Sequence, residues 1–162
     1  MKKTILVVLG SGGHTAQILR LVNLLGDKYD YEYIVGREDK TSEKRIKYSG
    51  RVFRLNTPRL MKDKSLFVVY LKMILTTIDA LKILFRTKSK VILSAGPASS
   101  LPLFFLAKKL FGKKTIFIES WVRVRNKSIT GGLIYPHSNL FFVQWPEMKK
   151  QYPNAIFAGR LD

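Results

Sequence analysis

Glycines and a histidine gather where an apolar strand is expected to give way to a helix. The segment GSGGHT, residues 10–15, follows the run TILVVL and precedes AQILRLVNLL. Glycines at such a turn let backbone N–H groups approach an anion at the positive end of the helix. The segment matches neither the dinucleotide fingerprint nor a P-loop, so NAD binding is disfavoured. Phosphate, pyrophosphate and sugar hydroxyls remain as ligands, and tight packing of the turn is the structural alternative.

His14 is the side chain of this segment that is best suited to chemistry. A neutral imidazole can bind a hydroxyl, contact a phosphate or act as a general base. Its alternative role is to help cap the start of the helix. Because three glycines surround it, we predict a role in binding or catalysis.

A second turn, SAGPASSLP, begins at Ser94 and also joins a strand to a helix. Gly96 and Pro97 shape the turn, and Ser99 or Ser100 is expected to cap the following helix. Open α/β sheets bind ligands at the carboxyl ends of their strands, so this turn is expected at the same edge as the first.

Glu119 directly follows another apolar run and is expected at that edge too. Its carboxylate can serve as a general base or bind sugar hydroxyls. An ion pair with Arg123 or Arg125 is the structural alternative, and such pairs are the commoner fate of a carboxylate.

The elements that position these residues follow from the alternation of apolar runs and helical patterns. Strands are predicted at 4–9, 31–35, 52–55, 90–94, 114–118, 140–143 and 155–158, and helices at 14–25, 65–86 and 98–111. Several strands are apolar on both faces, which is typical of parallel strands covered by helices on each side. The pattern predicts a single Rossmann-like α/β domain over residues 1–162, with a doubly wound, mostly parallel sheet and helices on both faces.

The charge of the chain indicates an anionic partner. Lys and Arg number 29 against 11 acidic residues, which gives a net charge of +18. Nucleic acid, an anionic membrane surface and a phosphorylated ligand all fit this excess. A basic nucleic-acid-binding α/β module is therefore one alternative function, although no helix-turn-helix, RNA-recognition or zinc-finger pattern is present. A self-sufficient small enzyme with another cofactor is a second alternative, without a cofactor fingerprint to support it.

The lack of cysteine limits the kinds of site in the chain, and the N-terminal pattern argues against a signal peptide. The chain has no cysteine, which excludes disulfides and thiolate metal sites. Its first apolar run covers six residues and ends in the glycine turn, which is short for a signal peptide. We therefore expect this run to be the first strand of the domain.

The segment 66–85 is apolar nearly all round and long enough, at roughly 30 Å, to match a bilayer core. Lys72, Asp79 and Lys82 interrupt it, and each costs about 2.5–3.5 kcal/mol near the centre of a membrane-spanning helix. An Asp79–Lys82 pair is expected to offset part of that cost. A buried core helix and a helix on an anionic membrane surface are equally compatible with the pattern, and a spanning helix ranks third. The residues predicted to face a membrane are Arg59, Lys62, Lys64, Phe67, Tyr70, Lys72, Lys82 and Arg86.

The quoted segments together resemble a known family. The chain is similar to the acceptor-side, membrane-associating subunit of the two-part UDP-N-acetylglucosamine transferase of asparagine-linked glycosylation. It also resembles the matching subunits of bacterial capsule and exopolysaccharide glycosyltransferases. The similarity is carried, in order, by GSGGHT, PR, SAGPASSLP, ESWVRV, SITGGLIYP, VQWPEMKKQYPNA and GRL. It implies the N-terminal half of a GT-B glycosyltransferase, like the acceptor domain of the enzyme that makes lipid II.

The resemblance implies a division of labour between two chains. This chain would bind a lipid-linked sugar acceptor at the cytoplasmic face of an anionic membrane, as a peripheral protein. A donor-binding glycosyltransferase subunit would hold the UDP-sugar, so this chain would bind no cofactor and no metal and would be inactive alone. The transferred sugar would be N-acetylglucosamine or another hexose, and nucleic acid would not be a partner. Eukaryotic members carry an N-terminal membrane anchor, whereas a strand is expected here from residue 4, so membrane attachment would rest on the 59–90 region.

The resemblance also assigns roles to residues. The catalytic candidates are His14 and Glu119. The residues expected to bind the acceptor's diphosphate or sugar are Gly10, Ser11, Gly12, Gly13, Thr15, Ser94, Gly96, Pro97 and Arg123. The expected contacts with the partner subunit are Trp145, Pro146, Arg160 and Leu161.

Overall fold

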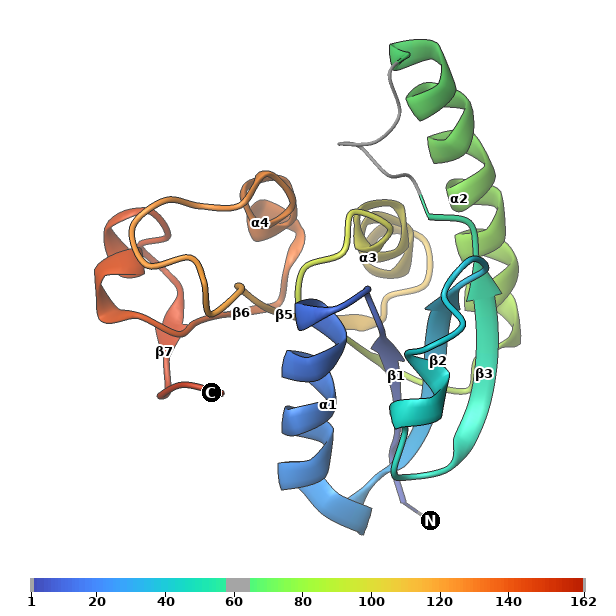
Figure 1. Ribbon diagram of the computed structural model, residues 1–162, viewed down its shortest axis with the longest axis horizontal. Coiled ribbons are helices and arrows are strands. Elements are labelled where there is room, and N and C mark those ends of the chain that lie inside the picture. The colour runs from blue at the N-terminus through green and yellow to red at the C-terminus, as the bar shows by residue number, and fades with distance from the viewer. Residues whose placement is uncertain (1, 58–64, 162) are drawn as a thin grey trace.

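A computed structural model describes residues 2–57 and 65–161, except for the side chain of Leu66. Among these residues, seven strands form one parallel sheet in the order β3-β2-β1-β4-β5-β6-β7 (Figure 1). The strands are β1 (Thr4–Val8), β2 (Asp30–Gly36), β3 (Gly50–Leu55), β4 (Val91–Ser94), β5 (Lys114–Ile118), β6 (Leu140–Val143) and β7 (Ile156–Phe157). The predicted parallel sheet is thus confirmed.

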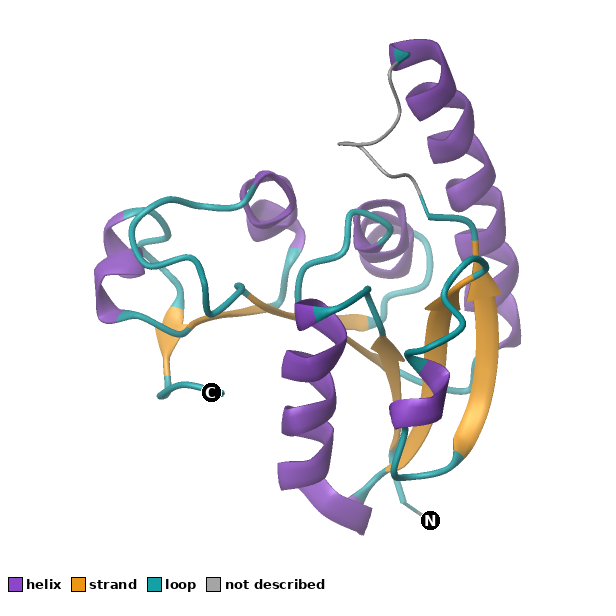
Figure 2. Cartoon of the chain, in the orientation of Figure 1, coloured by secondary structure: helices purple, strands orange, loops and turns teal. Residues whose placement is uncertain are grey.

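Helices follow the strands along the chain, as Figure 2 shows. They are α1 (Gly13–Leu25), α2 (Leu66–Arg86), α3 (Ser100–Lys109) and α4 (Ile129–Ile134), with short 3-10 helices η1 (Gly26–Lys28), η2 (Glu43–Arg45), η3 (Tyr135–His137) and η4 (Pro146–Lys150). The helices predicted at 14–25, 65–86 and 98–111 correspond to α1, α2 and α3. The sequence analysis did not predict α4, whose six residues ITGGLI are too few to show a helical stripe.

Both faces of the sheet are buried, because successive side chains of a strand point to opposite faces. Leu6 and Val8 of β1 pack on one face against side chains from α2, α3 and α4. Ile5 and Val7 pack on the other face against α1. This double covering explains why the strand sequences are apolar at consecutive positions, and it confirms the Rossmann-like class.

The strand order reverses between β1 and β4. From β1 the chain continues outward to β2 and β3, whereas β4 starts the opposite progression to β7. The turns after β1 and β4 therefore lie side by side at the point where connections diverge to the two sides of the sheet (Figure 1). Open α/β sheets bind ligands in the crevice at such a switch point.

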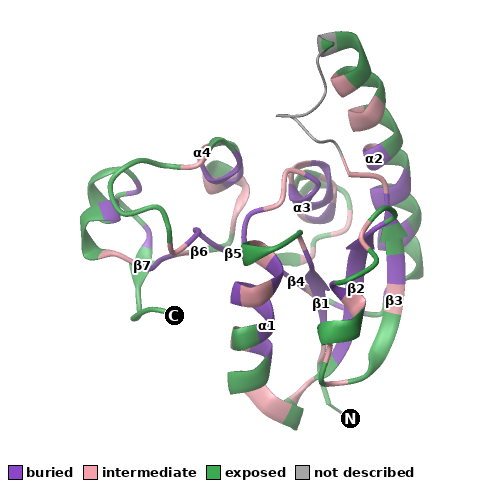
Figure 3. Ribbon diagram, viewed as in Figure 1, coloured by how far each residue is buried: buried purple, intermediate pink, exposed green. Residues whose placement is uncertain are grey.

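One face of α2 belongs to the core and the opposite face does not. Ala80, Ile83 and Leu84 are buried against the sheet, whereas Phe67 and Phe85 expose 71% and 74% of their surface. Figure 3 shows buried and exposed residues along the same helix. The core therefore accounts for only part of the apolar surface of this segment, and its placement on a membrane surface stays a prediction. No helix within the described parts of the chain is long and apolar enough to cross a membrane.

The carboxylate of Asp79 has a different partner from the one expected. It forms an ion pair with Arg37, 3.2 Å away, and accepts hydrogen bonds from the backbone and side-chain amides of Asn56. The expected pair with Lys82 is therefore wrong. Partial burial raises the pKa of the Asp79 carboxyl, but the hydrogen bonds from Asn56 and Arg37 outweigh it and leave the pKa below its ordinary value.

Candidate functional site

The imidazole of His14 joins the turns after β1 and β4. Its Nδ1 lies 2.7 Å from the carbonyl oxygen of Ala95. A carbonyl only accepts hydrogen bonds, so Nδ1 carries the proton and donates it, and in the neutral ring Nε2 keeps its lone pair. This contact across the switch point replaces the simple capping role that was the alternative for His14.

Two glycines make room for this ring. A Cβ at Gly10 would lie 2.7 Å from the His14 Cβ, and one at Gly96 would lie 2.5 Å from the imidazole Nδ1. Gly96 also has a φ of +118°, which side-chain-bearing residues rarely adopt. Both predicted glycine positions are therefore needed to seat the imidazole between the two turns.

The remaining glycines of the first turn border open space. Gly12 and Gly13 have no heavy atom within 4 Å of the place where a Cβ would stand. Both are exposed, as is Ser11, and Gly13 is the first residue of α1. The unpaired backbone N–H groups of a helix start carry partial positive charge. The turn thus offers donors for an anion beside the imidazole of His14.

A network of hydrogen bonds that was not predicted from the sequence holds the turn after β1 in place. The hydroxyl of Thr15 donates to the carbonyl of Gly10 and lies 2.8 Å from the Ser42 hydroxyl. Ser42 in turn donates to the carboxylate of Asp39, which also accepts from Thr41. Thr15, predicted to bind the ligand, is fully buried, and its side chain contacts protein groups.

Hydrogen bonding controls the charge of Asp39 in this network. Partial burial raises the pKa of its carboxyl, but hydrogen bonds from Ser42 and Thr41 outweigh burial and hold the pKa below its ordinary value. Asp39 is therefore ionised at neutral pH and anchors the Ser42 hydroxyl against the turn.

The second turn is built differently from the expectation. Ser99 has helical φ/ψ and makes no side-chain capping bond, because the Ser100 amide donates to the Pro97 carbonyl within the turn. The buried Ser94 and Ser100 hydroxyls lie 2.6 Å apart and bond to one another. The capping roles expected of Ser99 and Ser100 are thus wrong. Pro97 is partly exposed and contacts the Gly10 position, so it stands beside the first turn.

Glu119 follows β5 and turns its carboxylate inward. It is 1% exposed, and its oxygens accept hydrogen bonds from the Ser120 amide, the Ser128 amide and hydroxyl, and the Tyr152 hydroxyl 2.7 Å away. Burial and the bond to Glu119 raise the pKa of Tyr152 well above its ordinary value, so this hydroxyl stays a donor. Gly131 of α4 lies so close to the carboxylate that a Cβ at this position would clash with it. The glycine therefore allows α4 to approach Glu119.

Two buried glutamines bind the backbone around Glu119, and the sequence analysis missed both. The side-chain amides of Gln17 and Gln144 donate to the Glu119 carbonyl at 3.1 and 2.8 Å. The Gln17 carbonyl accepts from the Trp121 amide, so α1 is tied to the loop after β5. These contacts join residues 102 and 25 positions apart, and no local pattern predicts them. Arg123 lies in the same loop and is exposed.

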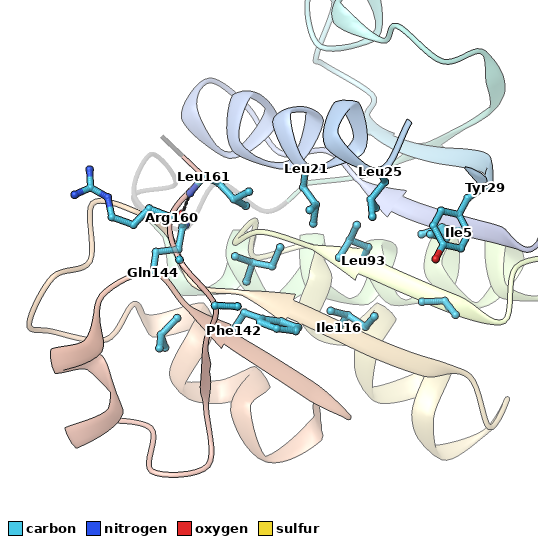
Figure 4. Close-up of a pocket in the computed structure, with 15 residues that line it drawn as sticks. Ile5, Leu21, Leu25, Tyr29, Leu93, Ile116, Phe142, Gln144, Arg160 and Leu161 are labelled. Atoms are coloured by element: carbon cyan, nitrogen blue, oxygen red, sulfur yellow. Dashed lines mark hydrogen bonds between the residues drawn. The ribbon is translucent and has the colours of Figure 1, made fainter. Parts of the chain in front are cut away.

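The residues predicted to meet a partner gather near the C-terminus. The Trp145 ring donates its N–H to the Trp121 carbonyl, and the Arg160 guanidinium lies 4.2 Å from the centre of that ring. The Leu161 amide donates to the Gln144 side chain (Figure 4). Pro146 is exposed at the start of η4.

An apolar groove adjoins this cluster on the α1 face of the sheet. It has a volume of about 310 Å³ and is lined by Leu21 and Leu25 of α1, by Leu93, Ile116 and Phe142 of the sheet, and by the segment 158–161 (Figure 4). Its walls are mostly apolar, with Gln144 and Arg160 at one end, so an apolar group is the natural occupant.

Within the described ranges, no cluster of three or more His, Asp or Glu side chains is arranged to hold a metal ion. The polar atoms that converge at the switch point are instead the α1 amides and the His14 imidazole. Such a set suits phosphate oxygens and sugar hydroxyls.

Comparison with known proteins identifies the family. Residues 5–161 match the family "Oligosaccharide biosynthesis protein Alg14 like". The "UDP-N-acetylglucosamine transferase subunit ALG14" of Rattus norvegicus is 31% identical, over 97% of this chain and 82% of the relative. The corresponding protein of Schizosaccharomyces pombe is 29% identical, over 98% of this chain and 83% of the relative.

Solved structures show the same fold at low identity. MurG of Acinetobacter baumannii aligns with a TM-score of 0.74 and 13% identity, over 99% of this chain and 45% of that chain. The UDP-GlcNAc 2-epimerase of Methanocaldococcus jannaschii aligns with a TM-score of 0.68 and 16% identity, over 93% of this chain and 42% of that chain. The domain thus has the fold of the N-terminal part of a GT-B enzyme, and the chain belongs to the Alg14-like family of oligosaccharide biosynthesis proteins.

Proposed function

We propose that this chain is the acceptor-binding, membrane-recruiting subunit of a two-chain UDP-sugar glycosyltransferase. The sugar is N-acetylglucosamine or a related hexose, the acceptor is a lipid-linked sugar, and the UDP-sugar site lies on a separate donor-binding subunit. The observation that carries the proposal is the pair of turns at the switch point, where glycine amides and one imidazole lie together in a member of the Alg14-like family.

Acceptor binding is supported by the chemistry of these two turns. The exposed backbone of Gly12 and Gly13 at the start of α1 suits the diphosphate of the acceptor. The Nε2 lone pair of His14 is oriented by the bond from Nδ1 to Ala95, as a general base requires. In this proposal His14 receives the proton of the acceptor hydroxyl as that oxygen attacks the anomeric carbon of the donor sugar. The bond between that carbon and the UDP oxygen breaks, and UDP leaves from the donor subunit.

Glu119 is the second catalytic candidate, and its contacts support a positioning role instead. To meet an acceptor hydroxyl, its carboxylate would have to leave the donors on Ser120, Ser128 and Tyr152. Abandoning buried donors costs about 1–3 kcal/mol each. We therefore propose that Glu119 holds the 120–128 loop, from which Arg123 reaches toward the acceptor.

A separate donor subunit is supported by the relatives, which match this chain over most of their length and are themselves named subunits. The groove on the α1 face offers that subunit an apolar docking surface, bordered by Trp145 with Arg160 stacked on its ring. Leu161 lines the groove, and Pro146 at the start of η4 is proposed as a further contact with the donor subunit.

The membrane role is supported by the exposed face of α2. Its apolar side chains recur every three or four residues and form one stripe, here called the α2 stripe: Phe67, Leu71, Ile74, Ile78, Leu81 and Phe85. Tyr70 lies beside the stripe, and Lys72, Lys82 and Arg86 provide charge along it. A helix of this kind lies in the plane of a membrane surface with its apolar side in the lipid. Arg59, Lys62 and Lys64 lie outside the described residues.

Reconstitution tests the proposal. The chain, a donor-binding subunit, a UDP-sugar and a lipid-linked acceptor should give sugar transfer only when both proteins are present. Leu21→Glu places a charge in the apolar groove and should weaken binding of the donor subunit at least tenfold in a titration. Leu24→Glu on the same helix is the matched control, since Leu24 is 70% exposed and does not line the groove. Transfer by the purified chain alone at the rate of the pair would overturn the proposal.

A further inference from the structure

A second groove lies at the opposite edge of the molecule from η4, between the edge strand β3 and the flank of α2. It has a volume of about 450 Å³. The described side chains that line it include five cations and one carboxylate: Arg37, Arg51, Arg54, Lys82, Arg86 and Asp79. We call it the basic groove. Lys82 and Arg86 are among the residues predicted to face a membrane, whereas the groove that they form with β3 is assigned no role in the proposed sugar transfer.

Part of its charge is already paired within the protein. Arg37 forms its ion pair with Asp79, and Arg54 pairs with Glu43. Arg51 lies over the ring of Phe53 and donates to the backbone carbonyl of Arg86. These contacts fix three guanidinium groups along the groove wall.

The other cations keep their charge without a partner. Among the described residues, the side chains of Lys82 and Arg86 make no hydrogen bond or ion pair, and both are exposed. Together with Arg51 they leave an excess of positive charge that no described carboxylate neutralises. An anion with several oxygens satisfies such donors, because guanidinium groups bind phosphate in a bidentate manner.

The basic groove borders the α2 stripe. Lys82 follows Ile78 of the stripe by four residues, so the two are neighbours on the helix surface. Arg86 lies one turn further along, next to Phe85. The two cations therefore lie beside the apolar side chains of the stripe. Phosphate groups likewise lie beside the apolar interior of a membrane.

We propose that the basic groove binds the phosphate of an anionic lipid headgroup and thereby fixes how α2 lies on the membrane. The inference rests on the membrane role within the proposed function and adds a specific site to it. Without such a site, the α2 stripe could rotate or slide along the surface. With it, the glycine turns at the switch point take one orientation toward lipid-linked acceptors.

Vesicle flotation with the full chain tests the site. The vesicles contain phosphatidylcholine with or without phosphatidic acid, and the variant is Lys82→Gln/Arg86→Gln. Each cation near an anionic surface contributes about fivefold to partitioning, so the variant should bind the acidic vesicles roughly thirty-fold more weakly. Its unfolding transition should match the parent chain, because both side chains are exposed and unpaired among the described residues.

A charge-matched control separates the groove from net charge. Lys149→Gln/Lys150→Gln removes the same charge from η4, which contacts β6 and β7 at the far edge of the sheet. Charges further from the surface than a Debye length of about 10 Å are screened, so binding should change less than about twofold. Equal losses for the two variants would overturn the proposal.

Two further arms complete the test. Inorganic phosphate, added at the concentration of lipid phosphate, should not release the chain from acidic vesicles. If it releases the parent chain through Lys82 and Arg86, the groove binds soluble phosphate and the lipid proposal is wrong. Transfer to a detergent-dispersed acceptor, with the donor subunit present, should survive Lys82→Gln/Arg86→Gln. If Lys82→Gln/Arg86→Gln loses vesicle binding and neither the parent chain nor the variant supports sugar transfer, the proposed function is wrong. The lipid site in the basic groove would still be supported.

Discussion

The turns at the switch point and the loop after β5 lie at one edge of the sheet, yet they are built in opposite ways. The turns after β1 and β4 use missing side chains: glycines at 10 and 96 admit the His14 ring, and Gly12 and Gly13 leave the backbone open. The loop after β5 uses a buried carboxylate, which gathers Ser120, Ser128 and Tyr152 around Glu119.

The difference distinguishes side chains that can still bond to a ligand from side chains that hold a loop in its conformation. A residue at the carboxyl end of a strand is a candidate for catalysis, but its hydrogen bonds decide which of the two it is. The Nδ1 of His14 donates to the Ala95 carbonyl, whereas its Nε2 makes no hydrogen bond with the described residues. Both carboxylate oxygens of Glu119 already accept hydrogen bonds from the protein.

The largest effect is expected from His14→Ala. If the imidazole is the general base, sugar transfer with the donor subunit should fall about a hundred- to ten-thousand-fold. The free energy of unfolding should fall by only about 1 kcal/mol, because one hydrogen bond is lost. His14→Gln is the control, since an amide can still donate to Ala95 but cannot take the proton. Transfer at the parent rate in either variant would contradict the comparison.

Glu119→Ala should have the next largest effect, on stability. Removing the carboxylate leaves the buried Tyr152 hydroxyl and Ser120 amide without an acceptor, and the free energy of unfolding should fall by about 3 kcal/mol. Urea denaturation measures this loss. Glu119→Gln keeps the shape and should cost less. If that variant were as stable as the parent but had lost transfer, the carboxylate would be a catalytic group and the contrast between the loops would fail.

Gly96→Ala should cost about 2 kcal/mol of unfolding free energy. The side chain is strained at a φ of +118°, and its Cβ would displace the imidazole of His14. Transfer should fall as well, because the ring can no longer face the acceptor. Gly132→Ala in α4 is the matched control: its Cβ would meet only the Lys127 side chain at 3.6 Å. Equal stability of the two variants would show that the turn adapts to a side chain.

The smallest effect is expected from Ser42→Ala, and it should depend on pH. At neutral pH the variant should be about 1 kcal/mol less stable, because Asp39 and Thr15 lose a partner. The folded-state pKa of Asp39 is lowered, so its contribution is present above the unfolded-state pKa and is lost as the pH falls through the folded-state value. The difference between variant and parent should therefore shrink in acid. A constant difference down to the acid transition would exclude Asp39 as the partner that matters.

The sequence was sufficient for the strands and for the three longer helices, but not for α4 or for the side-chain contacts. All seven predicted strands are present. In β1, β2 and β4 the consecutive apolar residues are a direct result of burial on both faces. The strand order that brings the two glycine turns together cannot be read locally. Nor could the roles of Gln17 and Tyr152, whose bonds to Glu119 span 102 and 33 residues.

The capping predictions failed for a local reason. Serines before a helix usually cap it, but the Gly-Pro turn lets the Pro97 carbonyl take the Ser100 amide, so no side chain is needed. The Asp79 prediction failed because the partner came from another element. Arg37 follows β2, and parallel pairing with β3 carries it next to α2.

The chain contains two tryptophans, and both belong to the hydrogen-bonded path that starts at α1. Gln17 binds the Trp121 amide, the Trp121 carbonyl binds the Trp145 ring, and Arg160 covers that ring. The chain therefore carries its own optical reporter. Intrinsic fluorescence follows this path without an attached dye, and docking that moves Arg160 from the Trp145 ring should change the environment of that ring and its emission.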